Sequence, residues 1–262
     1  MKPAKRGPDY GYVPEPKLVA MARPAHFLDS LPASYTVSPG FTPPPGAQGG
    51  PGHIGAPASC AAWSFLYGVA TFMGAQKGGL DVSDPANQVS PAYLYVKQRI
   101  QRGGIPPCKG SGFAFYINAL KTTGSPNCAV APYFSDCPDL VAKYKDQTCQ
   151  SDLRFNIQST AVVSTSDLDS VRQVLASNRP LAWCTNLYTD FVSYHGDPPV
   201  YVGNGILGKS VHCMVLLGYD DSTNAVFIQN SFGANWGVGG RAWIAYPTFQ
   251  KLAKGAALYI VD

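Results

Sequence analysis

The feature that most limits the fold of this chain is an apolar helix that directly follows a loop rich in glycine and proline. Gly and Pro dominate residues 40–58, so this backbone can make tight approaches that other residues forbid. Residues 59–73 then have helical length and are apolar on nearly all sides. A helix with this pattern must be buried on several sides. The sequence therefore predicts a core built around a helix that begins at or beside Cys60.

The periodicity changes from helical to strand-like along the chain. Helical patterns open at Ser90, Ser111 and Ser166, each a residue type that favours a helix start. Apolar runs typical of strands follow, separated by turns that contain Gly or Asp, at residues 181–184, 200–202, 211–219, 225–229, 242–246 and 257–261. The 262 residues suffice for one large domain or two halves that share a cleft. We expect an α+β fold with an antiparallel second half.

Composition excludes several classes of function. The net charge is only +4 and the cations are scattered, which disfavours nucleic acid and membrane surfaces as partners. Glu15 is the only glutamate, so zinc hydrolysis with a His-Glu-x-x-His motif is excluded. The four histidines show no ligand spacing, and no Cys-x-x-Cys occurs. We expect no metal and no organic cofactor, and no apolar run is long enough to span a membrane.

Residues 1–30 are predicted to form an N-terminal arm. They contain five prolines and mixed charge, without helical or strand periodicity. Such a segment is most simply a disordered tail. Its apolar and aromatic residues, among them Tyr12, Leu18 and Phe27, favour the alternative of an ordered strap that packs on the folded body and restricts a cleft.

Three residues have the types that nucleophilic catalysis by a thiol requires. Cys60 lies at a helix N-terminus, where backbone N–H groups and the helix dipole favour a thiolate. His212 interrupts an apolar strand and could exchange a proton with that thiolate, although a core histidine bonded to a carbonyl is the plainer interpretation. Asn230 follows the next strand and could hold the imidazole in one tautomer, although Asn is also an ordinary turn residue. In the order Cys, His, Asn, the three support one another.

At these residues the sequence resembles the papain-like cysteine peptidases, most closely their bacterial branch. The resemblance rests on Ser59-Cys60 entering a helix with Trp63 close behind, on His212 within a strand, and on the segment from Asn230 to Gly237. It covers residues 31–262 and implies a helical half at about 60–150 and a β-barrel-like half at about 151–262, with the active site in the cleft between them. The arm at 1–30 would take the place of the family's propeptide.

The resemblance also implies roles for individual residues. Cys60, His212 and Asn230 would form the catalytic triad of an endopeptidase that passes through an acyl-enzyme. Gln48, twelve residues before Cys60, would supply the side chain of the oxyanion hole. Substrate would contact Gly110, Ser111 and Trp236. A peptide or protein would be the substrate, and we expect the protein to be a monomer.

Departures from the family pattern leave alternatives open. An alignment on Trp63 would place Ala62 at the nucleophile position and imply a catalytically inactive peptide-binding module. The usual position of the oxyanion glutamine, six residues before the cysteine, holds Ile54, and His53 is a further candidate donor. Another Cys-His hydrolase, such as a cell-wall amidase or a transpeptidase, is the nearest rival enzyme.

The six cysteines other than Cys60 predict a partly oxidised protein. Cys184 and Cys213 lie in apolar strands and are interpreted as buried thiols. The other four lie in the loop-rich middle of the chain, and among their three possible pairings we favour Cys137 with Cys149 and Cys108 with Cys128. Disulfides there favour an oxidising compartment, secreted or periplasmic.

Overall fold

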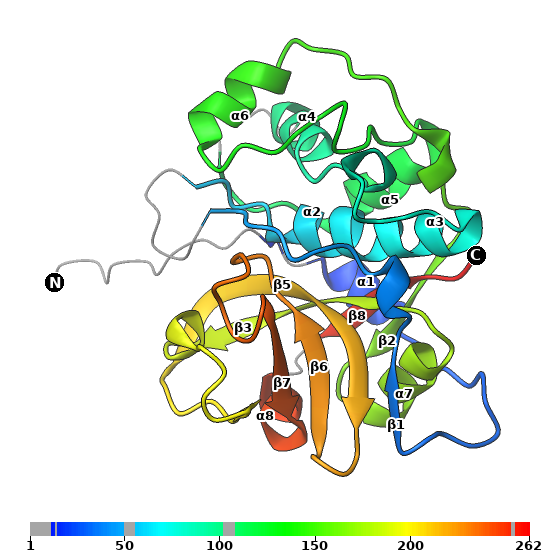
Figure 1. Cartoon of the computed structure of the whole chain (residues 1–262), viewed down its shortest axis with the longest axis vertical. Coiled ribbons are helices and arrows are strands. Elements are labelled where there is room, and N and C mark those ends of the chain that lie inside the picture. The colour runs from blue at the N-terminus through cyan, green and yellow to red at the C-terminus, as the bar shows by residue number, and fades with distance from the viewer. Residues whose placement is uncertain (1–11, 14, 50–55, 102–107, 253–254) are drawn as a thin grey trace, which may run out of the picture.

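The protein has a helical part and a sheet part that meet along one central helical rod (Figure 1). The computed structural model describes residues 12–13, 15–49, 56–101, 108–252 and 255–262. The helices α4, α5 and α6 lie on one side of the rod and the strands on the other (Figure 1). This arrangement confirms the expected α+β fold, with helices concentrated in the first half of the chain and an antiparallel sheet in the second.

The helices are short, and the sheet has eight strands. The helical segments are α1 (Pro16–Ala20), α2 (Cys60–Ala62), η2 (Trp63–Ala70), α3 (Thr71–Gly78), α4 (Tyr93–Gln101), α5 (Phe113–Thr122), α6 (Cys137–Tyr144), α7 (Leu168–Ala176) and α8 (Tyr246–Leu252). The strands are β1 (Ser34–Thr36), β2 (Thr160–Ser164), β3 (Leu181–Tyr188), β4 (Val200–Tyr201), β5 (Leu207–Asp220), β6 (Ala225–Gln229), β7 (Arg241–Ala245) and β8 (Ala256–Ile260).

The segments α2, η2 and α3 follow one another without a break and form the rod. Every residue of α2 and η2 is buried, as the apolar sequence of this stretch predicts. The rod packs against β3 and β5 on one side and against α5 on the other. Gly68 permits the contact with β5, because a Cβ there would lie 2.4 Å from a methyl group of Val215. The rod ends at Gly79, whose φ of 60° is the left-handed conformation that glycine adopts at helix ends.

The sheet has the strand order β2-β8-β3-β5-β6-β7-β4, and β1 pairs with β5 outside this order. All these pairs are antiparallel except β4 with β7. The central strand β5 carries His212, which lies opposite Thr185 of β3. The long strand thus carries one histidine within a largely apolar run.

Several local predictions need correction. The short elements β1, β2 and α6 were not predicted from the sequence, although the buried residues of α6 recur with a helical period. Helix α7 is capped by Asp167 rather than Ser166, because the Asp167 carboxylate accepts a hydrogen bond from the Ser170 N–H. Helix α4 begins at Tyr93, three residues after Ser90, whose hydroxyl accepts from the Ala92 N–H and donates to the Ala131 carbonyl.

The favoured disulfide pairings were wrong. Cys108 is bonded to Cys137, and Cys184 is bonded to Cys213. The second pair forms because β3 and β5 place the two residues directly opposite each other. Cys60, Cys128 and Cys149 lie outside the two disulfides.

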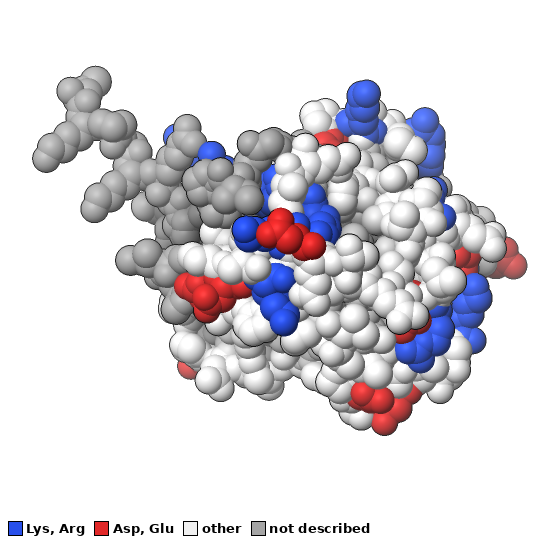
Figure 2. Space-filling model, turned by 90° about the horizontal axis from the view of Figure 1, so that it is seen from above, with Lys and Arg blue, Asp and Glu red and all other residues white. Residues whose placement is uncertain are grey.

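Charged groups are dispersed over the surface. On the face drawn in Figure 2, basic and acidic side chains are interspersed among uncharged ones. None of the helices in the described part of the chain is long and apolar enough to cross a bilayer.

We expect three of the seven cysteines to react with a thiol reagent in denaturant without reductant, namely Cys60, Cys128 and Cys149. Peptide mapping should recover the two linked pairs. Each disulfide spans 29 residues, so replacing both partners of one pair by Ala should lower the free energy of unfolding by about 2–4 kcal/mol. Seven reactive thiols, or a Cys137–Cys149 peptide, would contradict these pairings.

Candidate active site

Cys60 is the first residue of the buried rod. Ser59 precedes it as the N-cap residue, and the Cys60 side chain is fully buried. At this end of the rod the positive end of the helix dipole and the N–H groups of the first turn favour a thiolate. Ala62, the alternative nucleophile position, lies further inside the same helix. The helix terminus therefore supports Cys60 rather than position 62 as the reactive site.

His212 belongs to β5, a strand that packs against the rod. Helix α2 packs against β5, the strand that carries His212. The imidazole Nε2 lies 2.7 Å from Oδ1 of Asn230, which directly follows β6. The same Oδ1 accepts a hydrogen bond of 2.8 Å from the Ser231 N–H, so the oxygen is held in place. An amide oxygen accepts from Nε2–H and thereby selects the tautomer in which Nδ1 is the nitrogen that exchanges protons.

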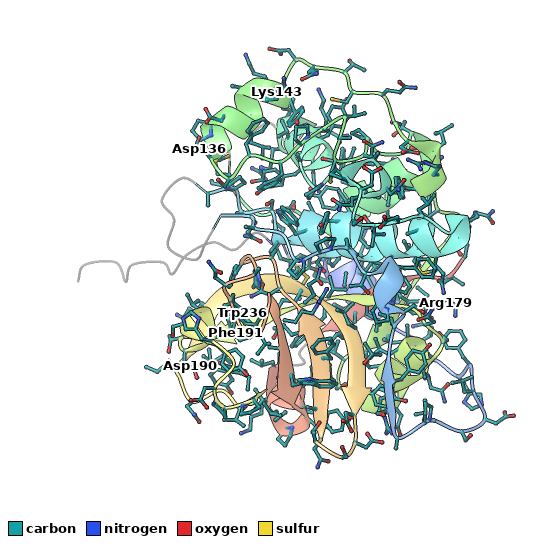
Figure 3. All side chains as sticks on the ribbon, in the orientation of Figure 1. Asp136, Lys143, Arg179, Asp190, Phe191 and Trp236 are labelled. Carbon is teal, nitrogen blue, oxygen red and sulfur yellow. A yellow bond between two sulfur atoms is a disulfide. The ribbon has the colours of Figure 1, made fainter. Side chains whose placement is uncertain are left out.

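Aromatic rings enclose the His212–Asn230 bond. The Phe232 ring stacks on the imidazole with ring centroids 4.6 Å apart. Trp236 packs edge-on against Phe232, and its indole N–H donates to the Phe191 carbonyl at 2.8 Å. Figure 3 shows Trp236 and Phe191 side by side, with ring centroids 4.7 Å apart. Only 3% of Trp236 is exposed, so in this structure it is a wall of the site rather than an open contact surface.

The buried environment of His212 disfavours its charged form. Burial lowers the pKa of His212 to about 4, although the hydrogen bond that the imidazole donates to Asn230 acts in the opposite direction. An imidazolium at this position therefore needs a negative charge beside it to be stable. A thiolate on the packed helix would supply that charge.

Gln48 is brought beside the histidine and asparagine by a short antiparallel contact. The Gln48 N–H donates to the Ser231 carbonyl at 2.9 Å, and Ala47 forms a bridge with Phe232. The Ser231 hydroxyl donates to Oε1 of Gln48 at 2.8 Å. Because Oε1 is engaged in this way, the Nε2 group is the part of the side chain that can donate to a ligand. The alternative donor His53, and Ile54 at the family's usual glutamine position, lie outside the described residues.

The loop also fits closely over the rod. A Cβ on Gly46 would lie 2.1 Å from the ring of Trp63. Glycine is therefore required for the loop to approach the helix this closely. Glycine in this loop thus allows the close approach to the rod that positions Gln48.

The rim residues Gly110 and Ser111 lie immediately before α5, and the arm covers them. The Gly110 carbonyl accepts from Arg99, and the Ser111 hydroxyl accepts from Tyr116. The Ser111 carbonyl accepts the Val13 N–H at 2.8 Å. Tyr12 forms a parallel bridge with Ser111. The backbone strip predicted to pair with substrate is therefore occupied by the chain's own N-terminal arm.

The only glutamate of the chain anchors this contact. The Glu15 carboxylate accepts from the N–H groups of Phe113 and Ala114, at the N-terminus of α5. Gly112, the N-cap residue, supplies no side-chain cap, and a Cβ there would lie 2.6 Å from the Glu15 carboxyl carbon. A carboxylate at a helix N-terminus is favourable because unpaired N–H groups and the helix dipole both point toward it.

The rest of the described arm lies on the sheet part. The Arg23 N–H donates to Val162 of β2, and the Gln173 side chain of α7 accepts from Phe27 and Leu28. Residues 12–13 and 15–28 therefore follow the alternative of an ordered strap rather than that of a disordered tail. Between this strap and the body lies a cavity of about 490 Å³ with mainly apolar walls, bounded by residues of the arm and by Phe113, Val162, Val211 and Leu258.

The described residues contain no cluster of three or more His, Cys, Asp or Glu side chains that could hold a metal ion.

Comparison with known proteins places the chain in a family. Residues 100–254, 155 of the 262, match the model of the papain family cysteine proteases. The fold is similar to that of xylellain, a cysteine protease from Xylella fastidiosa, with a TM-score of 0.70 and 21% identity over 97% of this chain and 92% of that one. The chain belongs to the papain family of cysteine proteases.

Two further solved structures share the fold. Procathepsin B S9 from Trypanosoma congolense has a TM-score of 0.67 and 16% identity, covering 96% of this chain and 85% of that one. Procathepsin L 3 from the larval midgut of Tenebrio molitor also has a TM-score of 0.67 and 16% identity, covering 97% and 76%. A search of curated protein sequences finds no match. The family match includes His212 and Asn230, whereas Cys60 and Gln48 precede it, so the case for these two rests on position and contacts.

Two contacts were not anticipated from the sequence. Ser231 orients the Gln48 side chain, and Glu15 binds the start of α5. The signal for Glu15 was present, because it is the only glutamate and lies in a Pro-rich segment. The position of Ser231 next to Asn230 gave no sign of its bond to a residue 183 positions away.

We expect His212 to titrate near pH 4 in a Cys60→Ala variant, and at a higher pH in the intact protein, where a thiolate favours the imidazolium. In that variant the neutral imidazole contributes fully to stability above about pH 6.5, the ordinary histidine pKa. This contribution, about 3 kcal/mol, is lost as the pH falls toward 4. NMR titration of the imidazole measures both pKa values. A value of 6.5 or above in Cys60→Ala would contradict the assignment.

Proposed function

We propose that the protein is an endopeptidase that uses Cys60 as nucleophile, His212 as acid and base, and Asn230 as the group that orients the imidazole. The observation that carries the proposal is the buried His212–Asn230 hydrogen bond of 2.7 Å on the strand that packs against the Cys60 helix. The membership of the papain family agrees with this chemistry.

In the proposed reaction, the Cys60 thiolate attacks the carbonyl carbon of a peptide bond. The negative charge that develops on the carbonyl oxygen is held by the Cys60 N–H and by Nε2 of Gln48. The imidazolium of His212 gives its proton to the leaving amine, which leaves an acyl thioester on Cys60. His212 then removes a proton from water, the resulting hydroxide attacks the thioester, and the thiol of Cys60 is regenerated as the acid is released.

The orientation of Gln48 supports its place in this scheme. Ser231 holds Oε1, and the backbone pairing with Ser231 holds the loop. A fixed donor stabilises a developing charge more than a mobile one, because no reorganisation accompanies the reaction. The same segment that contains Asn230 thus positions both the imidazole and the oxyanion donor.

The N-terminal arm is the inhibitory segment in this proposal. It takes the Ser111 carbonyl that an extended substrate would use, and the Tyr12 ring packs on Phe113 with ring centroids 5.3 Å apart. Burial raises the pKa of Tyr12 to about 12, with a further contribution from the charge of Glu15. Substrate must displace residues 12–15 before it reaches Cys60.

Replacing Cys60 by Ala is expected to reduce hydrolysis of a fluorogenic peptide to background, because no other group can form the thioester. Gln48→Ala should lower kcat by about 100- to 1,000-fold while leaving rapid alkylation of Cys60. Cys149→Ala, which removes another buried thiol, is the matched control and should retain activity. Full turnover by Cys60→Ala would refute the proposal, and turnover of peptidoglycan in place of peptide would favour the amidase alternative.

Replacing Glu15 by Ala is expected to raise kcat/KM for a peptide substrate by about tenfold, because two charge-assisted hydrogen bonds that hold the arm are lost. Asp29→Ala is the control, since it removes an exposed carboxylate from the same arm. Equal kcat/KM values for the two variants would show that the arm does not restrict the cleft.

A further inference from the structure

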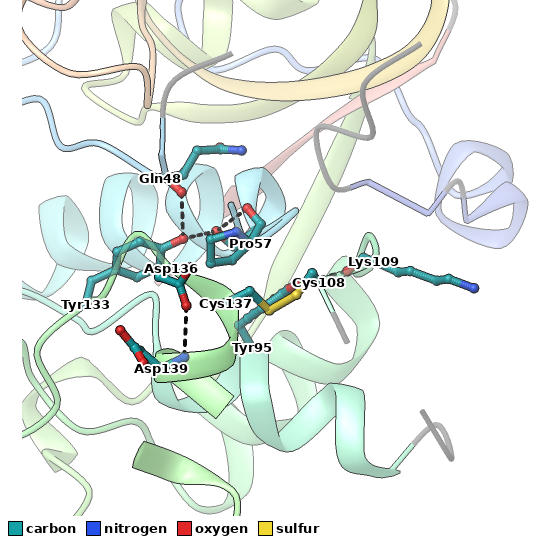
Figure 4. Close-up of a disulfide and its surroundings, with 10 residues drawn as sticks. Gln48, Pro57, Tyr95, Cys108, Lys109, Tyr133, Asp136, Cys137 and Asp139 are labelled. Carbon is teal, nitrogen blue, oxygen red and sulfur yellow. Dashed lines mark hydrogen bonds between the residues drawn. A yellow bond between two sulfur atoms is a disulfide. The ribbon is translucent and has the colours of Figure 1, made fainter. Parts of the chain in front are cut away.

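Tyr133 has no part in the reaction described above, yet its hydroxyl contacts two elements of the proposed site. It lies between α5 and α6, in the helical part of the molecule. Its hydroxyl donates to the Gln48 backbone oxygen at 3.1 Å and lies 2.6 Å from the Ser59 hydroxyl. Figure 4 shows Tyr133 below Gln48, close to the Cys108–Cys137 disulfide. The ring packs edge-on against Trp63 with centroids 4.9 Å apart.

The directions of these hydrogen bonds follow from the number of protons. A phenol has one proton, and the Gln48 carbonyl can only accept. Both contacts of the Tyr133 hydroxyl are satisfied when its proton goes to Gln48 and the Ser59 hydroxyl donates to the Tyr133 oxygen at 2.6 Å rather than to the Pro57 carbonyl at 3.5 Å. Burial raises the pKa of Tyr133, so the phenol remains a donor at neutral pH.

The bond to Ser59 has a consequence for the rod. A serine at the N-cap normally accepts from an N–H group of the first helical turn. The Ser59 hydroxyl makes no such bond here. Because it is directed to Tyr133, it does not compete for the N–H groups whose partial positive charge favours a thiolate at Cys60.

We propose that Tyr133 is a positioning residue that ties the oxyanion loop to the N-terminus of the Cys60 helix. Through Gln48 it fixes the loop that carries the oxyanion donor. Through Ser59 it keeps the N–H groups of the first helical turn available to the sulfur of Cys60. The inference rests on the function proposed above, since it concerns how the same site is held in its working geometry.

Replacing Tyr133 by Phe removes only the hydroxyl and keeps the ring against Trp63. We expect kcat to fall by about 10- to 100-fold with KM changed less than about threefold, because the donor is displaced while the substrate-binding surface is kept. Tyr219→Phe is the matched control, since the buried Tyr219 hydroxyl also donates to a carbonyl, that of Pro32, far along β5. The thermal midpoints of the two variants should be similar.

A second variant separates the two roles of the hydroxyl. In Tyr133→Phe the Ser59 hydroxyl is released to cap the helix, so alkylation of Cys60 by iodoacetamide should slow by about two- to fivefold. Adding Ser59→Ala removes the competing cap and should restore the alkylation rate. It should not restore kcat, because the Gln48 loop still lacks its partner. A residue that merely stabilised the fold would not produce this split.

The outcomes distinguish failure of this inference from failure of the proposed function. Turnover by the wild-type protein with equal kcat in Tyr133→Phe and Tyr219→Phe would overturn the positioning role alone. Absence of any turnover that depends on Cys60 would refute the proposed function, and the alkylation rates would then decide the positioning role independently. Slower alkylation that Ser59→Ala restores supports it. Alkylation unchanged by Tyr133→Phe, or slowed and not restored, overturns it.

Discussion

The site depends on one electrostatic constraint, namely that a fully buried imidazole is charged only when an anion lies beside it. Burial holds the pKa of His212 near 4 in spite of its hydrogen bond to Asn230, far below the range in which it could protonate a leaving amine at neutral pH. In the proposed mechanism a thiolate at Cys60 would reverse this balance, and the imidazolium would in turn favour the thiolate. The proposed mechanism therefore requires the N-terminus of the Cys60 helix to lie close to the middle of the strand that carries His212.

The rod and the sheet meet mainly by close packing of apolar side chains. The Ser64 hydroxyl of the rod also donates a hydrogen bond of 2.7 Å to the Met214 carbonyl of β5. Gly68 lets its backbone approach Val215, three residues beyond His212 on the same strand. Because protein interiors are densely packed, the separation of the two halves is set by such contacts. The packing of the core therefore sets the separation of the two proposed catalytic residues, Cys60 and His212.

The sequence was most informative where a residue type conflicts with its surroundings. A histidine occurs within the apolar strand 211–219, and a cysteine occurs at the junction of a Gly- and Pro-rich loop with an apolar helix. Both called for an explanation, and these are the residues of the proposed acid-base group and nucleophile. The disulfides could not be obtained in the same way. The pairing of Cys184 with Cys213 depends on the register of β3 against β5, which is a long-range property. Tyr133 likewise looks like an ordinary loop tyrosine until Gln48 and Ser59 are placed around it.

The N-terminal arm covers the rim of the proposed site at Ser111 and the start of α5. Its contacts with the rim use backbone groups of Ser111 and the N–H groups at the start of α5. Such groups belong to the rigid frame and remain in place when the arm leaves. The cavity beneath the arm has mainly apolar walls from α5, β2, β5 and β8, and Thr185 and Asn186 of β3 also line it. In the proposed function, substrate displaces the part of the arm that contacts the rim through the Glu15 carboxylate and the Val13 N–H.

Gln48 lies twelve residues before Cys60 rather than the six that are usual in the family, and this spacing has a physical explanation. Gln48 is held by Ser231 and Tyr133, and Ala58 is held by the Cys108 carbonyl at 3.0 Å. The chain between them is thus a loop with two fixed ends. Lengthening such a loop changes its closure entropy only slowly, by about 0.6 kcal/mol for each doubling. Extra residues between the oxyanion donor and the nucleophile then cost little, because the position of Gln48 is determined by contacts from other parts of the chain and not by its distance in sequence from Cys60.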